Sequence, residues 1–508
     1  APAGIDPEGL DQRILSLPNA SGEFVRLVCT KDRLFILDGE PWEDSGAALK
    51  CYDLEERKLD TVAEGVNDVE PAAGGDALLW RKGTELYLAD SKGKDPKRVP
   101  LGGVRVRVDP GAEWEQILRE VWRLQRDWFY DPNMHGVDWP AMLARWSPFL
   151  AHVRHRDDLN VVIAEMMGEL ACGHEYLWGG DAEKPPQGAG TGLLGADWEA
   201  AEGRYRIRRV LRGQNWNDGL RAPLTEPGVD ARAGDFLISV DGRPVTADLN
   251  LDAYFEGTAG RQVEVVLSAR ADGSEPRTSK VVPVDDESRL RRLAWVEERR
   301  ALVDRLTGGS VAYVYMPDTG PRGLAAFERD FYSQVDRKGL VLDERYNGGG
   351  KVADHVVEVL SRKVHCWWLS REGWVGRTPW AMLDGPKAMV INEYAGSGGD
   401  AMPWMFRRAG LGPLVGTRTW GGLVGISWYP PLVDGGRATA AAFGVLGTDG
   451  KWAVENEGVA PDHEVVETPA DSAEGRDPQL EKAVALVMEA MKTWKYAPKP
   501  AYAPPTPR

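Results

Sequence analysis

The chain has 508 residues, 43% of them hydrophobic, and carries 62 basic against 78 acidic side chains, a net charge of −16. This length exceeds one ordinary hydrophobic core, so two to four domains are expected. The acidic balance repels nucleic acid and anionic lipid. No apolar run approaches the roughly 18 residues of a membrane span. We therefore expect neither a nucleic-acid partner nor a membrane partner.

The cysteines and histidines indicate the compartment and exclude common metal sites. Four cysteines are scattered without a CxxC pair, and none of the seven histidines has HExxH spacing. This pattern argues against a zinc cage and a disulfide framework. It favours a reducing compartment, so we expect a cytoplasmic location. No metal or organic cofactor is implied.

Residues 1–108 read as short strands separated by polar turns. Strands are predicted at residues 24–29, 33–38, 48–54, 77–80 and 85–90. This spacing is typical of propeller blades or of a sandwich. Because the stretch is too short for a whole propeller, we expect the C-terminal part of one.

In residues 109–185 the spacing of the apolar side chains becomes that of helices. Apolar side chains recur at helical spacing from Glu113 to Trp128, and further helices are predicted at 139–149 and 159–170. We expect a helical subdomain whose aromatic stripe belongs to its core.

Residues 186–284 return to strands. Gly203–Val210 alternates cleanly, and Asp241-Gly242 is a tight-turn signal. The run from Gly234 to Val245 resembles the strand-turn-strand of PDZ domains, which bind chain ends by strand addition. The alternative is another small β-barrel with such a turn.

Residues 285–492 predict an α/β sandwich. Buried strands at 311–316, 339–343 and 388–391 alternate with helices, which favours a largely parallel sheet. The Pro-rich tail, 493–508, is predicted to be disordered. The whole chain is thus expected to be multidomain α+β, with a β-propeller remnant, a helical subdomain, a PDZ-like β-barrel and an α/β sandwich catalytic domain.

The segment NEYAGSGGDA, residues 392–401, places one serine where a strand passes into a helix. Small neighbours let a substrate backbone approach Ser397, and N–H groups near a helix N-terminus stabilise an oxyanion. The simpler interpretation is a helix N-cap followed by a glycine turn.

Three further segments supply partners for such a serine. His174, in ACGHEY, is a candidate general base, although a lone histidine is more often structural. The acidic run VENEGVAPD, residues 454–462, offers a glutamate that can orient an imidazole. The glycines of RYNGGG, residues 345–350, let backbone N–H groups point at an anion. Alone, the last two are ordinary loops.

Together these segments resemble the tricorn proteases, within the wider group of C-terminal processing peptidases. The resemblance covers nearly the whole chain and includes GTRTWGGLVGI, residues 416–426, and GHEYLWGGD, residues 173–181. It implies that Ser397 is the nucleophile, His174 the general base and Glu455 the acid behind it. It also implies an oxyanion hole formed by Gly398 with Gly350 or Gly349.

This sequence departs from the family pattern at two positions. The family usually has Ser directly before the histidine and Asp directly after the nucleophile, where this chain has Gly173 and Gly398. The first change predicts that a hydrogen-bond link from Glu455 to His174 is missing or made by water. The processing peptidases use a Ser–Lys pair instead, but Gly422 stands where their lysine would be. This favours the Ser–His mechanism.

We therefore predict a tricorn-type serine endopeptidase that cleaves short peptides from upstream proteolysis through an acyl-enzyme. The resemblance also suggests a homo-oligomer, a hexamer in the family. One alternative is a catalytically impaired relative that binds peptide ends through its PDZ-like domain. Another is a Ser–Lys peptidase with an essential lysine, for which Lys351 and Lys387 are candidates.

Overall fold

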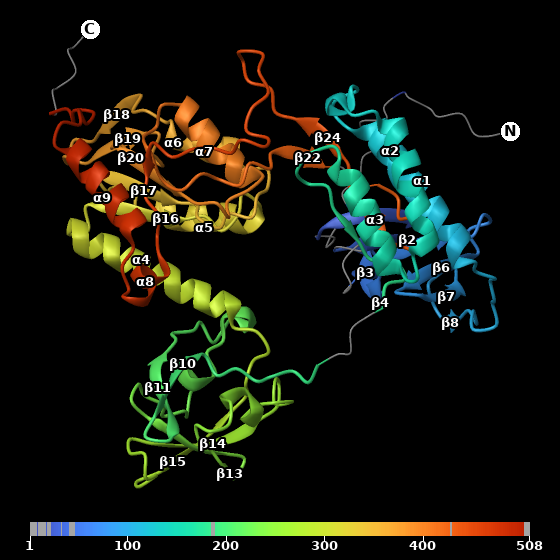
Figure 1. Ribbon diagram of the computed structural model, residues 1–508, viewed down its shortest axis with the longest axis horizontal. Coiled ribbons are helices and arrows are strands. Elements are labelled where there is room, and N and C mark those ends of the chain that lie inside the picture. Colours follow the sequence, from blue (N-terminus) through green and yellow to red (C-terminus); the bar gives the residue numbers. More distant parts are fainter. Residues whose placement is uncertain are drawn as a thin grey trace. The chain divides into compact units, whose positions relative to one another are not determined.

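A computed structural model of the chain describes residues 8, 17, 22–31, 33–39, 46–183, 188–426 and 429–501. The chain divides into two units, residues 1–108 and 109–508 (Figure 1). Within the described ranges, none of the helices is long and apolar enough to cross a membrane. Of the predicted tail, residues 493–501 form neither helix nor strand, and residues 502–508 lie outside the described part.

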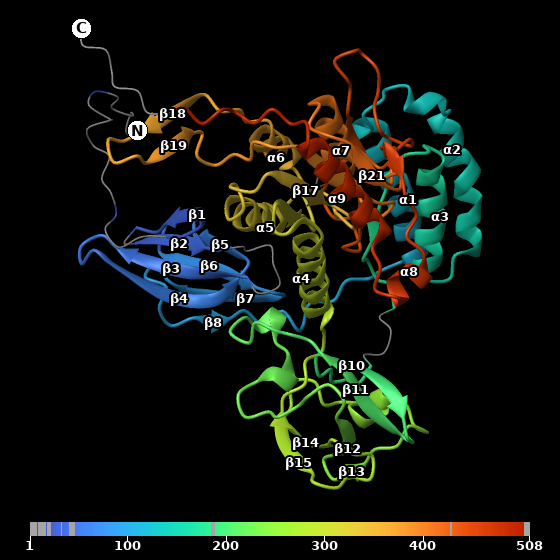
Figure 2. The ribbon, with the colours of Figure 1, turned by 90° about the vertical axis from the view of Figure 1, so that its left-hand side faces the viewer.

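The first unit contains two four-stranded antiparallel sheets, with strand orders β1-β2-β3-β4 and β5-β6-β7-β8 (Figure 2). The strands are β1 (Phe24–Cys29), β2 (Leu34–Asp38), β3 (Ala47–Asp53), β4 (Lys58–Val66), β5 (Asp68–Pro71), β6 (Ala77–Lys82), β7 (Glu85–Asp90) and β8 (Lys97–Arg98). The five predicted strands are confirmed. The predictions omitted β4, β5 and β8, in which polar residues interrupt the apolar alternation. Four-stranded meanders are the units of propeller blades, and the propeller origin stays a prediction.

The helical region confirms the three predicted helices as α1 (Pro110–Trp128), α2 (Trp139–Trp146) and α3 (Arg156–Gly168). The Asp109 side chain caps α1 by accepting a hydrogen bond from the N–H of Ala112. Helix α2 ends earlier than predicted, because residues 147–152 form a 3-10 turn that contains Pro148. The core of α1 to α3 also contains Val424, Ala438, Ala440 and Ala441, so a distant segment completes it.

The next region is an antiparallel sheet of order β10-β11-β12-β14-β15, with β13 paired to β12. Its strands are β10 (Ala196–Ala201), β11 (Arg204–Val210), β12 (Phe236–Val240), β13 (Arg243–Pro244), β14 (Val263–Ser268) and β15 (Arg277–Val281). The predicted tight turn joins β12 to β13, with φ of 47° at Asp241 and 75° at Gly242. Positive φ at both central residues is the geometry of a hairpin turn.

The last region is built on a parallel sheet of order β16-β17-β20-β21-β25, as predicted. These strands are β16 (Val311–Tyr315), β17 (Gly339–Asp343), β20 (Lys387–Ile391), β21 (Leu414–Gly416) and β25 (His463–Glu464). The helices are α4 (Ser288–Thr307), α5 (Pro321–Tyr332), α6 (Ala353–Leu360), α7 (Gly398–Arg408), α8 (Pro469–Ala473) and α9 (Pro478–Met491).

Helices cover both faces of this sheet (Figure 1). Along β16, Ala312 and Val314 pack with α5, α6 and α7, whereas Val311 and Tyr313 pack with α4 and α9. Both faces are therefore apolar, which explains the continuous hydrophobic runs of the strands.

Within the described residues, three two-stranded sheets complete the second unit. They pair β18 (Cys366–Leu369) with β19 (Val375–Thr378), β22 (Val424–Ile426) with β24 (Ala441–Gly444), and β9 (Leu177–Trp178) with β23 (Arg437–Ala438). The last pair joins the helical region to the segment that follows β21.

Candidate active site

Ser397 lies at the carboxyl edge of the parallel sheet, where β20 passes into α7. The loops after β16, β17 and β21 meet at the same edge, because parallel strands all end there. Ser397 is the N-cap of α7 and is half-buried. The predicted strand-to-helix setting is confirmed, and it agrees with both the N-cap and the nucleophile interpretations.

The backbone of Ser397 is strained, with φ of 57° and ψ of −116°. Such a conformation costs about 1–3 kcal/mol and persists only where neighbours hold it. Here the Ser397 N–H donates to the Gly422 carbonyl at 3.1 Å and to Asp400 Oδ2 at 2.9 Å. A serine held in this way resembles the strained elbow of other hydrolases.

Glycines pack tightly around Ser397. A Cβ on Gly349 would lie 2.7 Å from the Ser397 Cβ, and a Cβ on Gly398 would lie 2.4 Å from the Gly350 carbonyl oxygen. The structure thus brings together the residues predicted to form the oxyanion hole. Gly398 is the first residue of α7, so its N–H has no acceptor within the helix.

Thr319 occupies the space that a side chain at position 398 would need. A Cβ there would lie 2.0 Å from Thr319 Oγ1, which is buried and has no hydrogen-bond partner within the described residues. Thr319 also pairs with Gly350 as an isolated β-bridge. The site therefore accommodates glycine after Ser397 and excludes the aspartate that the family pattern predicts.

His174 follows α3, with a strained φ of 61° and only 8% exposure. Its carbonyl oxygen accepts a hydrogen bond from Thr439 Oγ1 at 2.6 Å, and its ring lies 5.4 Å from the Trp420 ring. Burial lowers the pKa of His174, while the charge of Glu455 opposes this shift. A neutral imidazole is the form that accepts a proton from a serine hydroxyl.

Glu455 binds two backbone groups, one of them on the residue directly before this histidine. Its carboxylate accepts hydrogen bonds from the Gly173 N–H at 2.6 Å and the Leu423 N–H at 2.7 Å. His174 Nδ1 is buried without a hydrogen-bond partner in the described part of the chain. The structure therefore places Glu455 beside the histidine, and the described residues contain no direct hydrogen bond between the two side chains. Whether the link is absent or made by water, as the glycine at position 173 predicts, stays a prediction.

The loop of residues 419–423 connects these groups. Gly422 accepts from the Ser397 N–H, and its Cα lies 3.2 Å from the Cβ position of Gly173. The Trp420 ring touches His174 and also lies against Gly396, just before the serine. Each of the three predicted catalytic residues thus contacts this loop or its immediate neighbours.

Asp400 anchors this loop, and the sequence analysis did not assign it a role. Its fully buried carboxylate accepts hydrogen bonds from the Thr419 hydroxyl and from the N–H groups of Gly421, Gly422 and Ser397. Burial raises its pKa, and these four donors act in the opposite direction. The capping-box spacing from Ser397 to Asp400 is a signal that identifies it.

Comparisons with known proteins add independent evidence. Three protein-family models match parts of the chain. The Tricorn protease C1 domain matches residues 110–168, the Tricorn protease PDZ domain matches residues 192–286, and Peptidase family S41 matches residues 310–465. Tricorn protease homolog 1 of Streptomyces coelicolor is 37% identical over 525 residues, which cover 99% of this chain and 48% of that protein.

One further sequence relative and one solved structure point to the same family. The Tricorn protease of Thermoplasma acidophilum is 31% identical over 454 residues, which cover 89% of this chain and 42% of that protein. A crystal structure of the tricorn protease superposes with a TM-score of 0.84 at 28% identity, over 94% of this chain and 47% of that one. The chain therefore spans about half the length of these relatives.

Proposed function

Because this chain belongs to the tricorn protease family, we propose that it is a serine endopeptidase that cleaves short peptides produced by upstream proteolysis. Ser397 is the nucleophile, His174 the general base and Glu455 the acid that favours a charged imidazole. The N–H groups of Gly398 and Gly350 form the oxyanion hole.

The reaction runs through an acyl-enzyme. The Ser397 hydroxyl attacks the peptide carbonyl while His174 takes its proton, and the two glycine N–H groups stabilise the tetrahedral oxyanion. His174 then gives the proton to the departing amine as the C–N bond breaks. Water, deprotonated by His174, next attacks the ester, and Ser397 regains its proton as the acid product leaves.

The observation that carries this proposal is the loop of residues 419–423. It bonds the Ser397 backbone through Gly422, bonds Glu455 through Leu423 and places Trp420 against His174. A structural N-cap serine needs none of these connections.

A Ser–Lys mechanism through Lys387 does not fit this geometry. Lys387 begins β20, whereas Ser397 follows its carboxyl end, and a strand of five residues spans about 17 Å. The Lys387 ammonium donates to the Gly385 carbonyl at 3.0 Å, and burial lowers its pKa to about 8. We assign Lys387 no part in the reaction.

Labelling with a fluorophosphonate probe, followed by peptide mapping, tests the proposal. We expect the label on Ser397 in the wild type and its loss in both Ser397→Ala and His174→Ala. Label that survives His174→Ala but disappears in Lys351→Met would establish a Ser–Lys pair instead. A folded wild-type protein that takes no label would support the alternative of a relative that only binds peptide ends.

We also propose that the chain forms homo-oligomers in the cytoplasm, as its resemblance to the family and its unpaired cysteines suggest. Light scattering coupled to size-exclusion chromatography tests the assembly, with a mass near six chains expected. A monomer at micromolar concentration would contradict it.

A further inference from the structure

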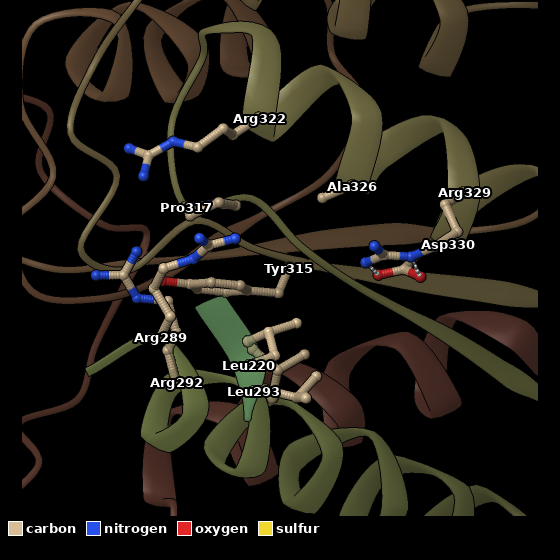
Figure 3. Close-up of a pocket in the computed structure, with 11 residues that line it drawn as sticks. Leu220, Arg289, Arg292, Leu293, Tyr315, Pro317, Arg322, Ala326, Arg329 and Asp330 are labelled. Atoms are coloured by element: carbon tan, nitrogen blue, oxygen red, sulfur yellow. Dashed lines mark hydrogen bonds and ion pairs between the residues drawn. The ribbon is translucent and has the colours of Figure 1, made fainter. Parts of the chain in front are cut away.

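Thr319 places a buried hydroxyl beside the proposed oxyanion hole. It lies in the turn between β16 and α5, and Figure 3 labels Pro317 and Arg322, which precede and follow it in the sequence. The residue is fully buried, and its Oγ1 has no hydrogen-bond partner among the residues that the structure describes. A buried polar atom without a partner is rare and costly in folded proteins, and a catalytic role is one reason to retain it.

The backbone of Thr319 is fixed on both sides. Its N–H donates to the Gly349 carbonyl at 2.9 Å, and its carbonyl accepts from the Val352 N–H at 2.9 Å. The neighbouring Asp318 is tied to α5, since its carboxylate accepts a hydrogen bond from the Gly323 N–H at 2.8 Å. The turn is therefore held by the glycine loop and by a helix. Within the described part of the chain, the hydroxyl is the polar group of Thr319 that lacks a partner.

This hydroxyl lies close to both proposed oxyanion donors. The Cβ position of Gly398 is 2.0 Å from Thr319 Oγ1 and 2.8 Å from the Gly350 nitrogen. The hydroxyl, the Gly350 nitrogen and the Gly398 backbone thus surround one point at the N-terminus of α7. The partial positive charge of a helix N-terminus favours an anion at such a point.

The glycine that follows Ser397 makes room for the hydroxyl. The family pattern has aspartate at this position, but here a Cβ on Gly398 would overlap Thr319 Oγ1. Because residue 398 has no side chain in this protein, the Thr319 hydroxyl borders the oxyanion hole in its place.

We propose that Thr319 is a catalytic residue, whose hydroxyl is a third donor of the oxyanion hole beside the N–H groups of Gly398 and Gly350. The inference rests on the proposed peptidase function and deepens it. As the oxygen of the scissile carbonyl gains negative charge, the Thr319 O–H donates a hydrogen bond to it, and the proton stays on Thr319. A hydrogen bond to a charged acceptor is stronger than one to a neutral carbonyl, so the hydroxyl stabilises the transition state more than the bound peptide.

Thr319→Val tests this role, because valine keeps the branched shape and removes the hydroxyl. We expect kcat for a fluorogenic peptide to fall by about 10²-fold with little change in KM, as for other oxyanion donors. The melting temperature should stay the same or rise, because the variant no longer buries a hydroxyl without a partner. Thr319→Ser keeps the hydroxyl and should retain most of the wild-type kcat.

Thr307→Val is the matched control. The Thr307 hydroxyl is also buried, but it donates to the Val303 carbonyl at 2.8 Å and lies at the end of α4. We expect this variant to lower the melting temperature and to leave kcat unchanged, the opposite of the result for Thr319→Val.

A peptide aldehyde and the matching peptide alcohol separate oxyanion stabilisation from peptide binding. The Ser397 oxygen adds to the aldehyde carbonyl, whose oxygen then lies in the oxyanion hole, whereas the alcohol binds without reaction. We expect Thr319→Val to raise the inhibition constant of the aldehyde by about tenfold or more and to leave that of the alcohol unchanged. If valine at this position prevents folding, Thr319→Ala must show the same difference between the two inhibitors.

Two results would overturn the role of Thr319: wild-type kcat in Thr319→Val, or an equal loss of affinity for the aldehyde and the alcohol. Fluorophosphonate labelling of Ser397 in the wild type tests the peptidase proposal separately. A wild type that takes the label, together with either of these results, removes only the third donor. A folded wild type that takes no label overturns the peptidase proposal and the role of Thr319 with it.

Discussion

The Glu455 carboxylate accepts a hydrogen bond from the backbone N–H of Gly173, at 2.6 Å, and the part of the chain that the structure describes shows none from the imidazole beside it. The proposed acid and base are thus neighbours through the main chain, and the buried Nδ1 of His174 has no hydrogen-bond partner among the described residues. Within that part of the chain the imidazole lacks an orienting hydrogen bond, and the position of His174 depends on packing and on the bond from Thr439 to its carbonyl.

Replacing Gly173 by serine should supply this link. A Cβ at this position would lie 3.2 Å from Glu455 Oε1, so the added hydroxyl can reach the carboxylate. Because base orientation contributes to general-base catalysis, we expect kcat to rise by about three- to tenfold. Steady-state kinetics with a fluorogenic peptide measures the change.

Gly173→Ala is the matched control, because it adds the same Cβ without a hydroxyl. We expect it to leave kcat unchanged or to lower it slightly through contact with Gly422. If the serine and alanine variants have the same kcat, the hydroxyl makes no productive link and the interpretation is wrong.

The pH dependence of kcat/KM should report the environment of His174. Burial lowers its pKa below the ordinary value of 6.5, and the charge of Glu455 raises it. The base must be neutral, so the midpoint of the acid limb of kcat/KM should lie below pH 6.5. In Glu455→Gln the opposing charge is lost, so the acid limb should move to still lower pH.

The exposed Glu457 lies in the same turn, and Glu457→Gln serves as the control for the change in net charge. Its acid limb should coincide with that of the wild type. A limb that moves to higher pH in Glu455→Gln would contradict the assigned roles of both residues.

The surroundings of the proposed nucleophile, Ser397, are predicted well from the sequence because they are local. An apolar run, a glycine-rich turn and a capping-box spacing determine β20, Ser397 and α7 within about twenty residues. The positioning of His174 depends instead on Thr439, 265 residues away, and on a helical core completed by Ala438, Ala440 and Ala441. Single-sequence periodicity carries no information about such distant pairs, so these contacts were not predicted.

Asp400→Asn should weaken both folding and catalysis. The buried carboxylate satisfies four donors, and an amide presents one oxygen and two N–H groups in its place. Each buried donor left unsatisfied costs about 1–3 kcal/mol. We expect a lower melting temperature and a lower kcat at temperatures where the variant is folded. The exposed Asp449→Asn should change neither quantity, and an Asp400→Asn enzyme with wild-type kcat would show that the loop needs no such anchor.

Adding a methyl group to Gly398 should damage the oxyanion hole while leaving Ser397 in place. A Cβ there would lie 2.4 Å from the Gly350 carbonyl oxygen and 2.8 Å from its nitrogen, so one of the two glycines must move. Loss of one oxyanion donor typically lowers kcat by about 10²- to 10³-fold, and we expect Gly398→Ala to approach this range with little change in KM. Gly348→Ala, in the loop that contains Gly350, adds a Cβ that meets nothing within 4 Å and should retain kcat. If both variants lose activity equally, loop flexibility rather than the Gly398 and Gly350 donors limits the reaction.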